Sequence, residues 1–238
     1  MFHPPRFYIG RPLTAAGEYT LDAEESRHAA GVLRLRAGDR VEVFDGLGVS
    51  ARAVILEAAA EMRLRTGEPE PQPPPLPRVG VATAIPKGKR WRVLVEKCTE
   101  LGVDRIVPLL SERSVARGEG DVSRWRRWSI EASKQCFRSH LPEISAPMAF
   151  FDFLENGISR DTVLILADRG GETPAFLTGR IAGGSEAFFL IGPEGGFIDA
   201  ETAAARSAGA SVVRLSPFRL RVETAAMAAV AMIRGLSG

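Results

Sequence analysis

Short apolar runs alternate with segments of helical spacing in the part of the chain that follows residue 78. Continuous apolar runs bounded by polar residues predict buried parallel strands at Val79–Ile85, Arg105–Leu110, Thr162–Leu166, Ala187–Ile191 and Ser211–Leu215. Apolar positions three and four residues apart predict helices at Trp91–Leu101, Val122–Phe137, Asp199–Ala208 and Glu223–Ile233. Alternation of strand and helix predicts an α/β fold with a parallel sheet.

Two of these helices carry end signals. Gly102 follows the first helix at a position that favours a left-handed residue. Asp199 is the expected N-cap of the third helix, because a carboxylate there accepts bonds from free backbone N–H groups.

The first 70 residues have a different, two-residue period. Val41–Phe44 and Ser50–Ile55 predict two strands joined at the turn Asp45-Gly46, and Glu24–Leu35 predicts a short helix. The stretch 67–77, GEPEPQPPPLP, has six prolines in eleven residues and predicts an extended spacer. We therefore expect a small β-barrel in residues 1–70 and an α/β domain in residues 71–238.

Composition narrows the class of protein. The chain has 238 residues, 45% of them hydrophobic and 25% charged, which is typical of a globular protein. A net charge of +2 excludes a histone-like polyanion binder but not a local basic patch. With two cysteines, scattered histidines, no secretory signal and no long apolar run, we expect a cytoplasmic protein with no metal and no membrane segment.

Candidate chemistry lies in three loops that follow predicted strands. They are Ala167–Glu172, Gly192–Phe197 and Ser216–Thr224. Ligands of open parallel sheets bind beyond the carboxyl ends of the strands, and glycine lets a ligand approach the main chain. The loop GPEGG matches neither the dinucleotide nor the phosphate-loop fingerprint, so it is also compatible with a plain strand-to-helix turn.

Basic residues form two further candidates for phosphate contact. The first is Lys87-Gly88-Lys89-Arg90-Trp91-Arg92, which contains no acid. The second comprises Arg113, Arg117, Arg124, Arg126, Arg127, Lys134 and Arg138. A solvated helix face is the alternative interpretation of both.

Taken together, these segments resemble the 16S rRNA uracil-N3 methyltransferases, the RsmE family of the SPOUT superfamily. The resemblance is carried by the ordered combination of residues 28–48, 85–115, 130–144, 189–201 (FLIGPEGGFIDAE) and 220–229 (LRVETAAMAA). It implies a C-terminal SPOUT-type trefoil-knotted parallel sheet with helices and an N-terminal PUA-like RNA-binding β-barrel.

The resemblance also implies a cofactor and partners. S-adenosylmethionine would bind between the three loops, at Leu166, Ile191, Gly192, Pro193, Glu194, Gly195, Gly196, Leu215, Ser216, Leu220 and Thr224. The substrate would be small-subunit rRNA, naked or in the assembled 30S subunit, and the enzyme would be a homodimer that uses Thr224–Ile233. RNA would contact Arg34, Arg36, Lys87, Lys89, Arg90, Arg113 and Arg138.

Two residues are catalytic candidates for methylation at uracil N3. Arg221 could stabilise the anion that forms on the uracil oxygens when N3 loses its proton, or it could bind Glu223 or a phosphate. Glu223 could accept the proton, or it could stabilise the start of the last helix. Ser216 and Phe218-Arg219 depart from the family pattern, in which glycine and Arg-Ile are usual.

Other functions remain open from the sequence. A ribose 2′-O-methyltransferase would share the fold, and a non-catalytic ribosome-assembly factor would explain the altered loop Ser216–Arg219. A nucleotide-dependent oxidoreductase is disfavoured, because the dinucleotide fingerprint is missing.

Overall fold

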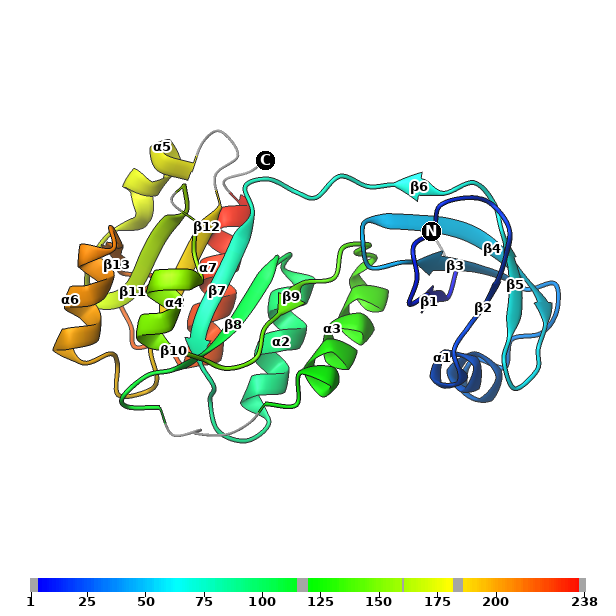
Figure 1. Ribbon diagram of the computed structural model, residues 1–238, viewed down its shortest axis with the longest axis horizontal. Helices are drawn as coiled ribbons and strands as arrows, with labels where there is room; N and C mark the ends of the chain where they lie inside the picture. Colours follow the sequence, from blue (N-terminus) through cyan, green and yellow to red (C-terminus); the bar gives the residue numbers. More distant parts are fainter. Residues whose placement is uncertain (1–3, 115–119, 160, 182–185, 236–238) are drawn as a thin grey trace. The chain divides into compact units, whose positions relative to one another are not determined.

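The chain folds into two compact units, each with its own sheet and core (Figure 1). The computed structural model describes residues 4–114, 120–159, 161–181 and 186–235. Unit 1 comprises Met1–Pro74 and Ile130–Leu141, and unit 2 comprises Pro75–Ser129 and Pro142–Gly238.

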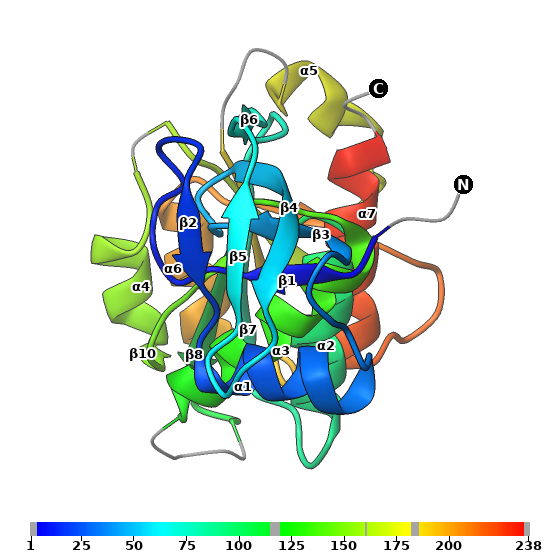
Figure 2. The same cartoon turned by 90° about the vertical axis from the view of Figure 1, so that its right-hand side faces the viewer.

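Unit 1 is built on a mainly antiparallel sheet, whose strands face the viewer in Figure 2. Its elements are β1 (Arg6–Tyr8), β2 (Glu18–Thr20), α1 (Ala23–Arg27), the π-helix η1 (His28–Val32), β3 (Arg40–Phe44), β4 (Val49–Glu57), β5 (Arg63–Thr66) and β6 (Glu70–Pro71). The strand order is β1-β3-β4-β5-β2, with β6 on β4, and among the described strands of this unit only β1 and β3 pair in parallel. The helix expected over Glu24–Leu35 is thus a short α-helix followed by a π-helical turn.

The predicted hairpin joins β3 to β4. Asp45 Oδ1 accepts hydrogen bonds from the backbone N–H groups of Leu47 (2.7 Å) and Val49 (3.0 Å), and Gly46 has a φ of 78°. The aspartate therefore closes the turn, and glycine supplies its left-handed residue.

Residues Ile130–Leu141 belong to unit 1, although they follow the proline-rich stretch by more than fifty positions. The Arg6 guanidinium donates to the carbonyls of Ser133 (3.2 Å) and Arg138 (2.9 Å) and to Ser139 Oγ (2.5 Å). Lys134 Nζ lies 2.8 Å from Glu25 Oε1. Buried polar contacts of this kind fix the segment against β1 and α1. No local sequence pattern predicts these contacts.

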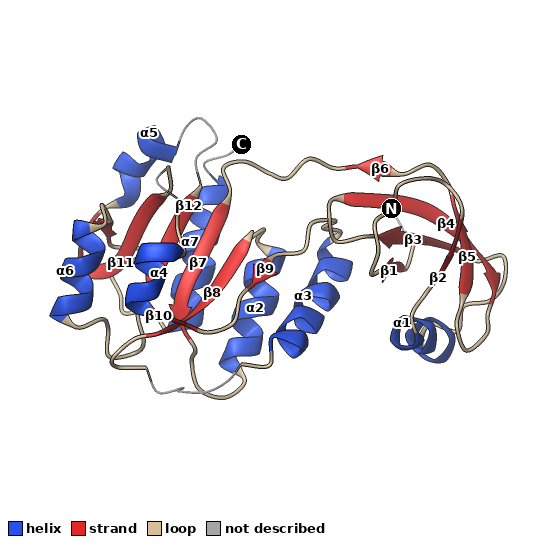
Figure 3. Cartoon of the chain, in the orientation of Figure 1, coloured by secondary structure: helices blue, strands red, loops and turns tan. Residues whose placement is uncertain are grey.

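Unit 2 is built on a parallel sheet (Figure 3). Its elements are β7 (Val79–Ala84), α2 (Arg90–Glu100), β8 (Arg105–Leu110), the first half of α3 (Val122–Cys136), β9 (Glu143–Ile144), β10 (Met148–Ala149), α4 (Phe150–Asn156), β11 (Val163–Glu172), the 3-10 helix η2 (Pro174–Phe176), α5 (Leu177–Ile181), β12 (Ala187–Ile191), α6 (Asp199–Ser207), β13 (Ser211–Val213) and α7 (Val222–Gly235). The strand order is β10-β8-β7-β12-β11-β13, with β9 on β8.

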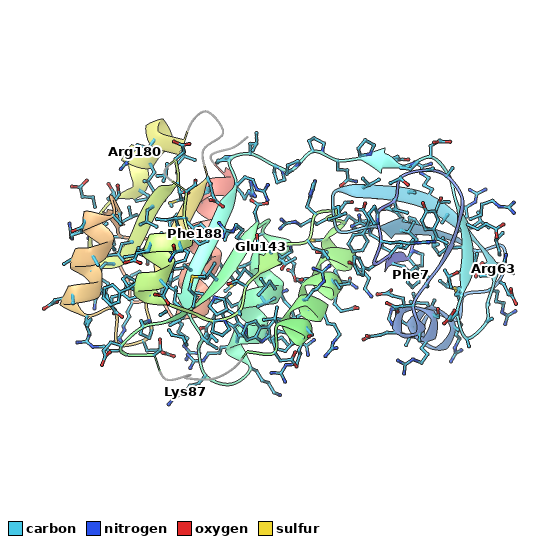
Figure 4. All side chains as sticks on the ribbon, viewed as in Figure 1. Phe7, Arg63, Lys87, Glu143, Arg180 and Phe188 are labelled. Carbon is cyan, nitrogen blue, oxygen red and sulfur yellow. The ribbon has the colours of Figure 1, made fainter. Side chains whose placement is uncertain are left out.

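Helices cover both faces of this sheet. On one face α2, α3 and α7 contribute Trp91, Trp125 and Ile233 to a common core, and the rings of Trp91 and Trp125 pack edge to face at 5.3 Å. On the other face α4 and α6 pack on Phe188 and its neighbours. Figure 4 marks Phe7 and Phe188, which belong to the cores of unit 1 and unit 2. The expected α/β class with a parallel sheet and a small N-terminal β unit is confirmed.

Two local predictions were wrong. Ala167–Glu172 is not a loop, because β11 continues to Glu172, which pairs with Val213 after a register shift. Asp199 is not the N-cap of α6, since Ile198 occupies that position. Glu201 Oε2 accepts the N–H of Ile198 at 2.9 Å, so this later carboxylate satisfies the helix start.

Candidate active site

The ends of β11, β12 and β13 surround a cavity of about 260 Å³ at the carboxyl edge of the unit 2 sheet. Its wall consists of Ala167, Asp168, Arg169, Ile191, Gly192, Pro193, Glu194, Gly195, Gly196, Phe197, Arg214, Leu215, Ser216, Phe218, Arg219, Leu220, Val222 and Ala225. The three segments singled out in the sequence therefore meet at one place. This is the edge at which ligands of open α/β sheets bind.

The segment Gly192–Gly196 exposes main chain to the cavity. Gly196 N–H donates to the Pro193 carbonyl at 2.8 Å, and Gly196 has a φ of 73°. A Cβ on Gly192 would lie 3.1 Å from the backbone nitrogen of Phe197. The turn thus requires a left-handed residue at one glycine and close backbone approach at the other.

Three arginines contact this turn. Arg113 Nη1 donates to the Gly195 carbonyl at 2.8 Å, and Arg219 donates to the Glu194 carbonyl. Arg90 Nη1 lies 3.0 Å from Glu194 Oε1. Two arginines predicted to contact RNA, Arg90 and Arg113, therefore also fix the shape of the cavity wall.

Most of the predicted cofactor residues line the cavity. These are Ile191, Gly192, Pro193, Glu194, Gly195, Gly196, Leu215, Ser216 and Leu220. Leu166 does not, because its side chain is 2% exposed in the core beside α4 and α6. Thr224 is exposed in the first turn of α7 and is also absent from the wall.

The two catalytic candidates lie next to the cavity in sequence but outside its wall. Arg221 is exposed immediately before α7. Glu223 is 7% exposed, and within the described part of the chain its Oε2 atom has no hydrogen-bond partner. A carboxylate oxygen with unused acceptor capacity at a helix start can accept a proton or bind a donor.

The cofactor assignment omitted several wall residues, although they lie in the candidate loops Gly192–Phe197 and Ser216–Thr224. Arg219 and Phe218 stand out in the sequence only as departures from the family pattern, yet Arg219 bonds the glycine-rich turn and Phe218 is 78% exposed at the cavity. Phe197 is the last residue of the predicted loop Gly192–Phe197, and it lines the cavity. The loop sequence alone does not predict the bond from Arg219 to Glu194, because the two residues are 25 positions apart in the chain.

The predicted RNA contacts divide between the units. Arg34 and Arg36 are exposed in unit 1, where Arg34 has a φ of 55°, and Arg138 is half-buried. Lys87 and Lys89 are exposed between β7 and α2, and Figure 4 marks Lys87 at this edge.

The second basic set does not form one exposed surface. Lys134 is buried, and its Nζ lies 2.8 Å from Glu25 Oε1 and 2.5 Å from Glu131 Oε1, so it is not available to phosphate. Arg117 lies outside the described residues.

Metal and membrane sites were not expected from the sequence. Among the described residues, no group of three His, Cys, Asp or Glu side chains could hold a metal ion. The helices of the same residues include none with the length and apolar character to cross a membrane.

The fold joins a small β unit to a parallel α/β sheet with a glycine-lined cavity at its carboxyl edge, which is where α/β proteins bind small-molecule ligands. Residues 72–234 match the family described as an RNA methyltransferase domain, and residues 21–61 match the one described as an RNA methyltransferase PUA domain. The class of the protein is therefore RNA methyltransferase.

Individual relatives define the family within this class. A Mycobacterium bovis protein named ribosomal RNA small subunit methyltransferase E is 32% identical over 95% of this chain and 90% of its own length. The Neisseria gonorrhoeae methyltransferase E structure, bound to S-adenosyl methionine, has 28% identity and a TM-score of 0.87 over 98% of both chains.

A Legionella pneumophila putative methyltransferase in complex with SAM has 26% identity and a TM-score of 0.88, again over 98% of both chains. The chain belongs to the ribosomal RNA small subunit methyltransferase E family. This confirms the resemblance found in the sequence.

Proposed function

We propose that the protein transfers a methyl group from S-adenosylmethionine to N3 of a uridine in small-subunit rRNA. The observation that carries this proposal is the cavity at the carboxyl edge of the sheet, with Gly192–Gly196 in its wall. Family membership supplies the substrate class, because the relatives are named for the small ribosomal subunit.

The residues of the cavity fit this cofactor. The volume of about 260 Å³ lies just below the range of about 300–1,000 Å³ for small-molecule sites, and the cavity opens to solvent at the sheet edge. The glycine turn offers main-chain donors and acceptors, and Leu215 and Leu220 offer apolar surface for an adenine ring. When bound, S-adenosylmethionine supplies an electrophilic methyl group on a sulfonium.

The protein must present uracil N3 without its proton. N3 lies on the pairing edge of the base, so the uridine has to be unpaired or turned out of a helix. Loss of the N3 proton places negative charge on O2 and O4, and the exposed Arg221 guanidinium can approach these oxygens from the start of α7. Arg221 is thus the proposed stabiliser of the uracil anion.

Glu223 is the candidate acceptor for the N3 proton. Its buried Oε2 has no hydrogen-bond partner among the described residues, which leaves both lone pairs of this oxygen available to a donor. Its position in the first turn of α7 also stabilises the helix, so a structural role competes with catalysis. Glu223→Gln removes both the proton acceptor and the charge at the helix start, so loss of methylation with unchanged thermal stability would indicate catalysis, and loss of both would indicate the structural role.

Partners and location complete the proposal. RNA would contact Arg34, Arg36, Lys87, Lys89, Arg90, Arg113 and Arg138, in naked rRNA or in the assembled 30S subunit in the cytoplasm. The enzyme would act as a homodimer through α7, which buries Ala226 and Ile233 within unit 2 and leaves Met227 and Met232 partly exposed.

Calorimetric titration with S-adenosylmethionine tests the cofactor site. Gly195→Trp places a large ring at the cavity wall, where even an added Cβ would lie 3.3 Å from Arg113 Cδ. Gly179→Trp is the matched control, because a Cβ on Gly179 of α5 would have no atom within 4 Å. We expect saturable binding by the wild type and the control and none by Gly195→Trp; binding that survives in all three contradicts the assignment.

Product analysis tests the reaction itself. Nucleoside digestion of methylated rRNA is expected to give 3-methyluridine. A methyl group on ribose would establish the 2′-O activity instead, and cofactor binding without any methylated product would favour the assembly factor.

A further inference from the structure

A second cavity, of about 550 Å³, opens on unit 2 where β8 and β10 end. It is lined by Leu110, Ser111, Glu112, Ser114, Ala149, Phe150, Phe151, Ile198 and Glu201. We propose that it receives an unstacked base of the RNA substrate, the base of a nucleotide adjacent to the methylated uridine. This inference rests on the proposed function and adds a site that reads sequence around the target.

The linings of the two cavities have no residue in common, but they meet at two consecutive residues. Phe197 lines the cofactor cavity, and the next residue, Ile198, lines the second cavity. The rings of Phe150 and Phe197 are 5.0 Å apart. With S-adenosylmethionine in the first cavity and the target uridine at its mouth, the base of an adjacent nucleotide can therefore enter the second cavity at this edge.

Arg113 links the same two places. Its neighbours Glu112 and Ser114 line the second cavity, whereas its guanidinium donates to the Gly195 carbonyl in the wall of the first. The side chain is exposed. An RNA phosphate between the two bases would meet this arginine.

The lining of the second cavity suits a base and not a phosphate. Phe151 is 50% exposed, whereas its neighbour Phe150 is 1% exposed and belongs to the core. An exposed aromatic face is the platform on which proteins stack unpaired bases. The carboxylate of the exposed Glu112 repels phosphate from the same opening.

Polar groups in the cavity can read a base edge. Ser111 Oγ lies 2.8 Å from Ser114 Oγ, and Ser114 also accepts the N–H of Ser111 at 2.9 Å. The hydroxyl of the half-exposed Ser111 can turn to donate or accept. The Glu201 carboxylate is committed to the structure, because its oxygens accept the N–H groups of Glu112 (2.8 Å) and Ile198 (2.9 Å).

Positively charged side chains outside the cavity would bind the phosphate backbone of the RNA. Ala84 at the end of β7 pairs with Leu109 on β8, so the exposed Lys87 and Lys89 follow the strand next to the cavity. Cations around an aromatic and acidic opening favour an arrangement with the base inside and the phosphates outside.

Phe151→Ala tests the proposal, with RNA affinity as the first readout. Equilibrium binding of a small-subunit rRNA fragment is measured at one salt concentration by fluorescence anisotropy. We expect the dissociation constant for RNA to rise about 5- to 150-fold in Phe151→Ala. In Phe151→Trp, which keeps an aromatic face, it should equal that of the wild type. S-adenosylmethionine affinity should not change. The control is Leu101→Ala, because Leu101 is an exposed apolar residue at the end of α2.

A modified substrate gives a second, independent readout on the wild-type protein. RNAs carry an abasic residue on either side of the target uridine. We expect one of the two abasic RNAs to bind the wild type as weakly as the unmodified RNA binds Phe151→Ala. The same abasic RNA should bind the wild type and Phe151→Ala with equal affinity. Two abasic RNAs that bind the wild type normally overturn the proposal, even if Phe151→Ala proves unfolded.

Other outcomes are also decisive. If the wild type forms no methylated product but Phe151→Ala still weakens RNA binding, the base pocket is supported and the proposed reaction is rejected. Methylation with RNA affinity unchanged in Phe151→Ala rejects the pocket and leaves the reaction in place. Loss of self-association in that variant, with unchanged RNA affinity, would identify the cavity as an interface between two copies and also reject the pocket.

Discussion

The buried pair of Glu25 and Lys134 in unit 1 predicts an unusual dependence of stability on pH. Glu25 is 6% exposed, and its Oε1 lies 2.8 Å from Lys134 Nζ. Its Oε2 has no hydrogen-bond partner among the described residues. Burial raises the pKa of Glu25 from 4.5 to about 7, although the hydrogen bond from Lys134 acts in the opposite direction.

The sign of the effect follows from proton binding. Between pH 4.5 and about 7 the folded protein keeps a proton on Glu25 that the unfolded chain releases. The stabilisation is therefore complete below the unfolded pKa and is lost as the pH rises through the folded pKa. A shift of this size corresponds to about 3 kcal/mol at ~1.4 kcal/mol for each pKa unit.

Glu25→Gln removes the titrating group and should flatten this profile. The amide keeps the shape of the side chain, and Lys134 keeps Glu131 as a partner at 2.5 Å. We expect the stability of the wild type relative to the variant to fall by about 3 kcal/mol between pH 4.5 and 8. Glu24→Gln, at the exposed neighbouring position, should leave the profile unchanged.

Amide hydrogen exchange in β3 and β4 is the suitable assay, because it reports opening of unit 1 without requiring the whole chain to unfold at once. Comparison of wild type and variant at each pH cancels the intrinsic exchange rates. A difference that stays constant to within about 1 kcal/mol over this range would refute the reasoning.

Three further outcomes are expected. Arg234→Met should lower the stability of unit 2 by about 3–5 kcal/mol in thermal unfolding, because the guanidinium bonds the 3% exposed Asp104 at 2.6 Å; a loss no larger than that of the exposed Arg206→Met would contradict this. Burial raises the pKa of the Cys98 thiol to about 12, so iodoacetamide at pH 8 should modify the half-buried Cys136 and spare Cys98 in mass spectra; equal labelling would show that the site opens. Lys87→Ala with Lys89→Ala should weaken RNA binding and reduce the salt slope by about 1–2, whereas an unchanged slope would remove these lysines from the interface.

Much of unit 2 could be predicted from the sequence. The continuous apolar run Ala187–Ile191 has the same bounds as β12, and Arg105–Leu110 has those of β8. Buried parallel strands need apolar side chains on both faces, so their sequences are distinctive. The family motifs also located the glycine turn Gly192–Gly196 in the cavity wall.

Features that depend on distant partners were not predicted. Two-residue strands such as β9 and β10 exist only because β8 offers free backbone groups beside them. The extension of β11 to Glu172 needs β13 as a partner, and the N-cap of α6 is completed by Glu201. Each of these depends on hydrogen bonds that local propensity does not encode.

The sequence by itself determined the α/β class, the family and the glycine-rich turn, because periodicity and ordered motifs are local properties of the chain. Only the tertiary structure decided that Ile130–Leu141 packs in unit 1, that Arg113 and Arg219 hold the turn, and that Phe151 stands exposed in a second cavity. The physical reason is that buried polar contacts and cavities form between segments far apart in sequence. Their energies depend on how the strands are ordered and packed, not on which residues are neighbours along the chain.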